Sequence, residues 1–266
     1  CAKIVVLLAG VPRQPGMTRA QLFDINANIV KETAENCARY CPTTCLLLVT
    51  NPVNSMVPVA CEVFKREGHD NDARIFGVTT LDLVRASTFV AEEKGLDPSE
   101  VHLPVIGAHS GSTIVPLFSQ MTPQVNITEE EAQRLTHSVQ VAGTEVVKAK
   151  GKGSATLSIA FATMRLVISI ARALQGARCV IECAYVRSNV MKGCDYFATP
   201  LKLGQYGIKE NLGIPAISEF EKKLVEKAIP DIQKDIKKGL DYVKHLYEGG
   251  DKDKNTCKRK NPTGCI

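Results

Sequence analysis

The stretch KIVVLLAG, residues 3–10, decides the class of fold. After Lys3 it is apolar without interruption, and it ends at Gly10. A strand with one face in water alternates apolar and polar residues, whereas a strand of a parallel sheet is covered on both faces and is apolar throughout. Residues 3–9 therefore predict a buried strand of a parallel sheet, so the chain begins inside an α/β architecture.

The segments that follow alternate between helix and strand. Apolar residues recur at helical spacing from Ala20 to Arg39, and Cys45 to Val49 is again a short apolar run. The alternation continues with a helix at Ser55 to Arg66, a strand at Arg74 to Val78 and a helix at Leu81 to Lys94. Alternating strands and helices predict a doubly wound, Rossmann-type parallel sheet.

The second half of the chain changes character. Its apolar stretches lie close together, which favours antiparallel pairing and an α+β domain. These stretches are Val101 to Ile106, Ser112 to Leu117, Val180 to Val186 and Phe197 to Leu203. Thr128 and Ser218 each precede a glutamate by three residues, the spacing of a capping box, and Ser154 is placed to cap the helix that ends near Leu174.

The composition argues against several classes of protein. The net charge of +5 is concentrated after Asp251, aromatic residues make up only 5%, and there is no Trp, so a nucleic-acid binder is not expected. No uninterrupted apolar run reaches the roughly 18 residues of a bilayer-spanning helix. The ten cysteines lack the C-x-x-C spacing that zinc sites favour, although Cys37, Cys41 and Cys45 are evenly spaced; we expect free thiols in an intracellular reducing compartment and no metal.

Four short segments carry the candidate chemistry: AGVPRQPGMTR (9–19), VTNPVN (49–54), TLDLVR (80–85) and GAHSG (107–111). Together they resemble the malate dehydrogenase branch of the lactate/malate dehydrogenase family, over a region from Val5 to about Val243. The resemblance implies reversible hydride transfer between NAD and malate or oxaloacetate, and a homodimer. It also implies the remaining part of a dinucleotide-binding domain at 1–78 and a substrate domain at 79–248, before a basic tail at 249–266 that we expect to be disordered.

The resemblance assigns the acid–base pair to His109 and Asp82. Oxidising a secondary alcohol requires a base that takes the hydroxyl proton, and an imidazole serves both directions of the reaction. A carboxylate partner fixes the tautomer of that imidazole and stabilises its charged form. The plainer alternative is that Asp82 and Arg85 form an ordinary i, i+3 ion pair. The remaining histidines have no such context, and we expect surface or structural roles for His69, His102, His137 and His245.

The resemblance assigns the substrate to three guanidiniums and an amide. Arg85 matches the residue that holds the substrate carboxylate, for which a planar bidentate donor is suited. Arg19 matches the residue that polarises the substrate carbonyl; the alternative is that Arg19 is an ordinary cation on the surface of a helix. Asn51 matches a hydrogen-bond donor to the same region. The resemblance implies that Arg13 faces the far end of the substrate, at a position where lactate-specific relatives place Gln. A second guanidinium there favours a dicarboxylate, and the loop between Arg13 and Arg19 suits a lid.

The cofactor side of the resemblance is incomplete. The residues that match nicotinamide-side contacts are Gly10, Asn26, Val49, Asn51 and Ile159, although the family usually has Met at the position of Ile159. The sequence lacks the G-x-G-x-x-G fingerprint, and residues 3–9 correspond to the fourth strand of the fold, so we expect roughly 60 to 75 residues with strands one to three to be missing. The first strand would then be an exposed edge, and the 266-residue chain would bind NAD poorly or not at all.

Two alternatives stay open at this stage. One is a dehydrogenase for another 2-hydroxy acid, such as lactate or an aromatic analogue; the other is a non-catalytic paralogue that keeps the fold for binding. The choice between NAD and NADP is also open, as is the compartment, which could be the cytosol, the mitochondrion or another organelle.

Overall fold

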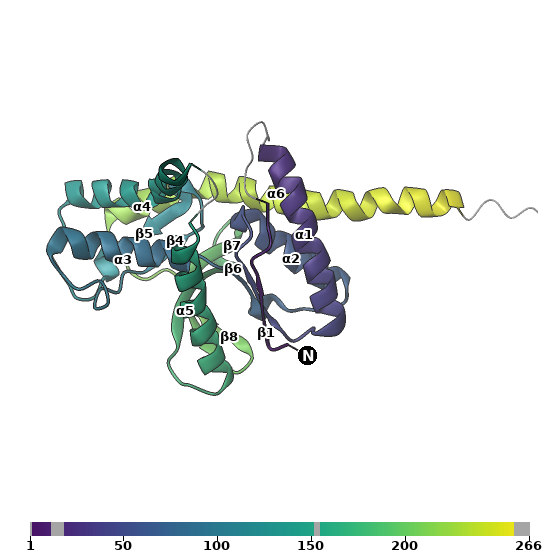
Figure 1. Cartoon of the computed structure of the whole chain (residues 1–266), viewed down its shortest axis with the longest axis horizontal. Coiled ribbons are helices and arrows are strands. Elements are labelled where there is room, and N and C mark those ends of the chain that lie inside the picture. Colours follow the sequence, from purple (N-terminus) through teal and green to yellow (C-terminus); the bar gives the residue numbers. More distant parts are fainter. Residues whose placement is uncertain (1, 12–18, 152–154, 258–266) are drawn as a thin grey trace, which may run out of the picture.

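The computed structural model describes residues 2–11, 19–151 and 155–257 (Figure 1). The side chains of residues 19, 20 and 249–257 lie outside this description. Arg13 falls in a gap, and Arg19 is described by its backbone alone. Residues 258–266 of the basic tail are likewise not described.

The first half alternates strand and helix as the sequence predicts. Its strands are β1 (Ile4–Leu7), β2 (Cys45–Leu48) and β3 (Ile75–Gly77), and its helices are α1 (Arg19–Tyr40), α2 (Val53–Arg66) and α3 (Thr80–Lys94). The strands pair in parallel, with Ile4 opposite Cys45 and Leu46 opposite Ile75. The strand β1 lies at the end of the sheet, and of its residues only Leu7 is buried, whereas every residue of β2 is buried.

Alternate residues of β2 face the two layers of helices that cover the sheet. Leu46 and Leu48 belong to the core that also holds residues of α1, α2 and α6 (Glu219–Cys257). Cys45 and Leu47 point the other way, into a core shared with α5 (Leu157–Leu174). The uninterrupted apolar character of this strand thus follows from cover on both faces.

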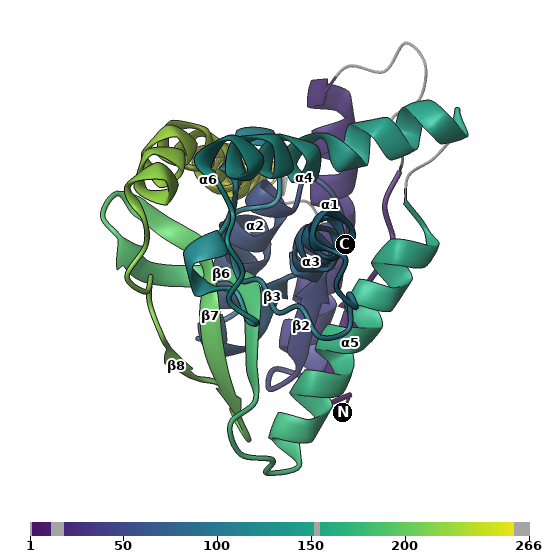
Figure 2. The ribbon, with the colours of Figure 1, turned by 90° about the vertical axis from the view of Figure 1, so that its left-hand side faces the viewer.

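The strands of the second half join the same sheet. They are β4 (Val105–Gly107), β5 (Ile114–Pro116), β6 (Ile181–Met191), β7 (Cys194–Gly204) and β8 (Gly207–Asn211). The order is β1-β2-β3-β6-β7-β4-β5, with β8 on β7, and the antiparallel part meets the parallel part where Gly77 pairs with Tyr185. Figure 2 shows the long β6–β7 hairpin and the helix α5 beside it. The strand β4 begins later than predicted because Pro104 has no N–H to donate to a ladder.

Helix starts agree with the sequence in two cases and differ in one. Thr128 and Glu131 form a reciprocal capping box before α4 (Glu129–Lys150), and Ser218 and Glu221 form another before α6. The prediction that Ser154 caps the next helix was wrong: α5 begins at Leu157 and has Thr156 as its N-cap. The helix α6 also continues past Gly249 to Cys257, beyond the point at which we expected order to end.

Among the described helices, α5 is long and apolar enough, by length and composition alone, to cross a membrane. It nevertheless carries Arg165 and Arg172, and its inner face buries Leu166 and Ile170 against the sheet. This packing is typical of a helix that covers one face of a sheet.

Candidate active site

The predicted site segments converge where strands of the sheet end. The parallel strands β1, β2 and β3 are followed by Gly10, Asn51 and Asp82 respectively, at the carboxyl edge where α/β folds bind ligands. His109 follows β4, after a turn at Gly107. That glycine has φ +95°, and a Cβ on it would lie 2.1 Å from the carbonyl oxygen of Thr113, so only glycine allows the turn that presents His109.

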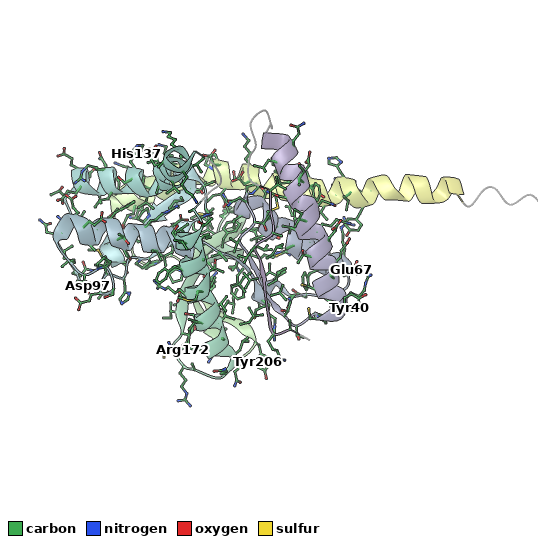
Figure 3. All side chains as sticks on the ribbon, viewed as in Figure 1. Tyr40, Glu67, Asp97, His137, Arg172 and Tyr206 are labelled. Carbon is green, nitrogen blue, oxygen red and sulfur yellow. The ribbon has the colours of Figure 1, made fainter. Side chains whose placement is uncertain are left out.

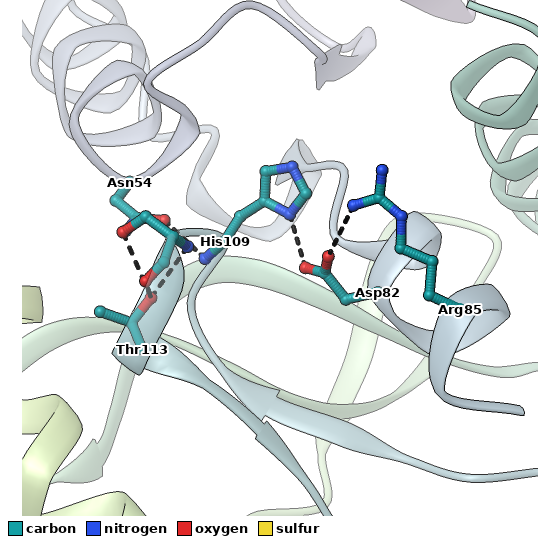
Figure 4. Close-up of polar contacts among 6 residues, drawn as sticks. Asn54, Asp82, Arg85, His109 and Thr113 are labelled. Carbon is teal, nitrogen blue, oxygen red and sulfur yellow. Dashed lines mark hydrogen bonds and ion pairs between the residues drawn. The ribbon is translucent and has the colours of Figure 1, made fainter. Parts of the chain in front are cut away.

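His109 and Asp82 form the predicted pair (Figure 4). Nδ1 of His109 lies 2.5 Å from Oδ2 of Asp82. The Asp82 side chain is fully buried, whereas 12% of the His109 side chain is exposed. A buried carboxylate that contacts one ring nitrogen leaves the other free, so the ring has one structural nitrogen and one that can meet a reactant.

The surroundings of His109 act on its pKa in opposite directions. Burial disfavours the imidazolium and lowers the pKa, and the charge of Arg85 acts the same way. The charge of Asp82 and the hydrogen bond to it raise the pKa, and together they prevail, so the pKa of His109 lies above 6.5. The imidazolium is therefore the form that Asp82 stabilises.

Arg85 contacts the other oxygen of the same carboxylate. One of its terminal guanidinium nitrogens, Nη1, lies 3.9 Å from Oδ1 of Asp82, and 14% of the Arg85 side chain is exposed. Oδ1 has no hydrogen-bond partner among the described residues. Burial lowers the pKa of Arg85 and the charge of Asp82 opposes this, but a guanidinium remains charged. Asp82 thus places an imidazole and a guanidinium side by side.

Asn54 is a residue of the site to which we assigned no role from the sequence. It lies at the start of α2, is 1% exposed, and its Oδ1 accepts a hydrogen bond from the backbone N–H of His109 at 2.7 Å. Although VTNPVN was among the quoted segments, no spacing rule relates Asn54 to a loop 55 residues further along the chain.

Comparisons with known proteins identify the family of this chain. A family model described as the lactate/malate dehydrogenase NAD binding domain matches residues 1–77, and one described as the lactate/malate dehydrogenase alpha/beta C-terminal domain matches residues 79–243. The chain is 54% identical to human mitochondrial malate dehydrogenase and 53% identical to that of Sus scrofa. Each match covers 91% of this chain and 72% of the relative. The chain belongs to the lactate/malate dehydrogenase family.

Solved structures of the lactate/malate dehydrogenase family share the fold. The malate dehydrogenase from Picrophilus torridus in its apo form gives a TM-score of 0.78 at 25% identity, covering 92% of this chain and 76% of that one. The Cryptosporidium parvum malate dehydrogenase gives 0.75 at 26% identity, covering 89% of this chain and 76% of that one. The predicted family and the Rossmann-type fold are thereby confirmed.

The residues that match nicotinamide contacts in this family lie in two sets. Gly10 and Asn26 lie together, because a Cβ on Gly10 would lie 3.5 Å from Oδ1 of Asn26. The Asn26 amide is 2% exposed; it accepts from the N–H of Val11 at 2.8 Å and donates to the carbonyl of Asn51 at 2.7 Å. Val49 and Ile159, each partly exposed, pack against one common apolar cluster. Their cofactor contacts remain predictions.

Two substrate residues expected in this family are outside the described part of the chain: Arg13, and the side chain of Arg19. The other histidines lie away from the pair: His102, His137 and His245 are exposed and His69 is half-buried. Figure 3 shows His137 on the outer surface at α4. No group of three or more His, Cys, Asp or Glu that could hold a metal ion occurs among the described residues.

Proposed function

We propose that the protein is an NAD-dependent malate dehydrogenase that interconverts malate and oxaloacetate. The observation that carries the proposal is the contact of 2.5 Å between His109 and the buried Asp82, with Arg85 at the other oxygen of the same carboxylate. His109, which can accept a proton, and Arg85, which can bind a carboxylate, thus contact the same carboxylate of Asp82. A 2-hydroxy acid requires both groups side by side.

The Asp82 carboxylate determines which nitrogen of His109 reacts. A carboxylate only accepts hydrogen bonds, so Nδ1 carries a proton and donates it, and Nε2 of the neutral ring is the free acceptor. In malate oxidation Nε2 takes the hydroxyl proton, and Asp82 stabilises the imidazolium that results. In oxaloacetate reduction the same Nε2–H returns the proton to the carbonyl oxygen.

Arg85 would hold the carboxylate next to the reacting carbon. Its guanidinium can donate two parallel hydrogen bonds to a carboxylate, and its pairing with Asp82 at 3.9 Å keeps it beside His109. Arg19 would polarise the reacting carbonyl and Asn51 would donate a hydrogen bond to the same region. The choice of a four-carbon diacid over lactate rests on Arg13, whose positive charge suits a second carboxylate.

The residues of this chain fit the nicotinamide end of NAD. Val49 and Ile159 are partly exposed apolar residues that pack against the same cluster, and Gly10 has no side chain to fill the space beside the amide of Asn26. These residues, with Asn51, would hold the ring. When bound, NAD supplies the acceptor of the hydride in malate oxidation and its donor in the reverse direction.

A substrate panel tests the proposal. Protein produced from its complete reading frame is assayed for NADH oxidation with oxaloacetate, pyruvate and phenylpyruvate in parallel. We expect oxaloacetate to be reduced with the highest kcat/KM. A preference for pyruvate or phenylpyruvate would favour the dehydrogenase for another 2-hydroxy acid, and folded protein that reduces none of them would favour the non-catalytic paralogue.

We further propose a homodimer in a mitochondrial setting, without nucleic acid or membrane as partners. The names of the relatives from human and Sus scrofa include "mitochondrial", and the described cysteines are all free thiols, as a reducing compartment allows. Light scattering of the purified protein and fractionation of the source cells test these two points separately.

A further inference from the structure

The amide of Asn54 joins the His109 backbone to the C-terminal helix. Its Oδ1 accepts from the N–H of His109 at 2.7 Å, while its Nδ2 donates to Oδ2 of Asp235 at 2.8 Å and to Oγ of Ser110 at 2.9 Å. Figure 4 shows Asn54 on the far side of His109 from Asp82. His109 is thus held at its ring and at its backbone by separate groups.

The orientation of this amide follows from its partners. A backbone N–H can only donate and therefore requires the oxygen of Asn54, and a carboxylate can only accept and therefore requires the nitrogen. Because Asn54 is 1% exposed, water does not offer a substitute partner to a displaced amide. The hydrogen bond to Asp235 thus fixes the side-chain amide of Asn54 in the orientation in which Oδ1 faces the backbone N–H of His109.

The helix α6 is fixed against α2 at this point. Oγ of Ser55 donates to the backbone carbonyl of Asp235 at 2.8 Å. One turn further on, a Cβ on Gly239 would lie 2.4 Å from the backbone oxygen of Ser55, so the two backbones touch. One turn earlier, Asp231 accepts from Oγ of Ser112 at 2.6 Å. The carboxylate of Asp235 therefore projects from a rigid support.

We propose that Asp235, acting through Asn54, is a positioning residue that holds the backbone of His109 in the place from which its ring exchanges a proton with substrate. The inference rests on the proposed dehydrogenase function. Among the described residues, neither Asn54 nor Asp235 forms a hydrogen bond with the imidazole ring. They affect the position of the ring through the backbone of His109. A displacement of about 1 Å at a reacting group can lower the rate by up to about 100-fold.

A reciprocal exchange tests this role. Asn54→Asp places two carboxylates against each other, and we expect kcat for oxaloacetate reduction to fall about 10- to 100-fold. Asp235→Asn leaves an amide that can still accept from Asn54, so we expect a smaller fall. The double variant restores one donor and one acceptor at the contact, with a carboxylate oxygen still available to the N–H of His109. We expect its kcat to exceed that of Asn54→Asp by about fivefold or more.

The control is Glu226→Gln, which removes a carboxylate from an exposed position of α6 and should leave kcat and Tm unchanged. NADH affinity should be unchanged in all variants, because the Asn54–Asp235 contact acts on the backbone of His109 and includes none of the residues proposed to hold NAD. A merely structural contact would lower Tm without lowering kcat of the folded enzyme. If Asn54→Asp does not fold, Asp235→Ala provides the same comparison of kcat with Tm.

The outcomes separate this inference from the proposed function. If the unmodified protein reduces oxaloacetate but the folded Asn54→Asp or Asp235→Ala variant keeps its full kcat, the positioning role is overturned and the function stands. A double variant no more active than Asn54→Asp at equal Tm also overturns it. If the unmodified protein reduces no 2-oxo acid, the proposed function falls, and the inference with it.

Discussion

The ring and the backbone of His109 are held by two regions of the chain that differ in their separation along the sequence and in the chemistry of their contacts. The ring meets Asp82, 27 residues earlier, through a charged contact. The backbone meets Asn54, which in turn meets Asp235, 181 residues away, through an amide that carries no charge. The first contact changes the proton affinity of the ring, and the second can change only its location. Substitutions on the two sides should therefore alter different measured quantities.

The largest effect is expected at Asp82, because it acts on the proton itself. Asp82→Asn keeps the shape but removes the charge that stabilises the imidazolium, and its amide nitrogen can force the wrong tautomer on His109. We expect kcat for oxaloacetate reduction to fall by about 10²- to 10⁴-fold, with Tm little changed only at pH values above the raised pKa of His109, where the contact no longer contributes to stability. If kcat of Asp82→Asn fell no further than kcat of Asp235→Ala, the region that holds the ring of His109 and the region that holds its backbone could not be distinguished by their effect on the reaction.

Arg85→Lys should affect substrate binding more than proton transfer. The lysine keeps the positive charge beside Asp82 but loses the planar pair of donors. We expect KM for oxaloacetate to rise by roughly 10-fold or more, because one of two charge-assisted hydrogen bonds is lost. Steady-state kinetics with oxaloacetate varied at saturating NADH measures this. A fall confined to kcat would instead assign Arg85 to the support of Asp82.

The pH dependence separates the two regions most directly. The net effect of Asp82 raises the pKa of His109 above 6.5 despite burial. Malate oxidation needs the neutral ring, so its kcat/KM should fall as pH drops through that raised pKa, whereas oxaloacetate reduction needs the imidazolium and should fall as pH rises through it. Asp82→Asn should move both transitions to lower pH. Asp235→Asn should lower the rate at every pH and leave the transitions in place.

The same pKa has a consequence for stability. Because it is higher in the folded protein, the Asp82–His109 contact contributes fully below pH 6.5, and its contribution is lost as pH rises through the folded-state value. Thermal unfolding followed from pH 5 to pH 9 should show this loss in the unmodified protein and not in Asp82→Asn. An unchanged pH dependence of Tm would show that Asp82 and His109 are not coupled.

The sequence predicts those parts of the molecule in which the controlling residues are close together in the chain. An uninterrupted apolar run predicted β2, and the family resemblance carried by short motifs implied the pairing of His109 with Asp82, which the structure brings into contact. The pairing of Gly77 with Tyr185, which unites the parallel and antiparallel strands in one sheet, has no local signal. Asp235 also could not be predicted, since it lies in an ordinary amphipathic helix and its role depends on how α6 crosses α2. The cofactor and substrate roles of Gly10, Asn51 and Arg13 remain predictions.

The smallest effect is expected at Ser112, which tests how far the support from α6 extends. Its hydroxyl donates to Asp231 at 2.6 Å, one turn from Asp235, but this contact is exposed to solvent. In Ser112→Ala water can take the place of the hydroxyl, so we expect a loss of about 0.5–1.5 kcal/mol in stability and less than about threefold in kcat. If kcat instead falls as far as it does in Asp235→Ala, then Asp231 holds the His109 loop as strongly as Asp235 does, and the buried amide of Asn54 is not the principal anchor of that loop.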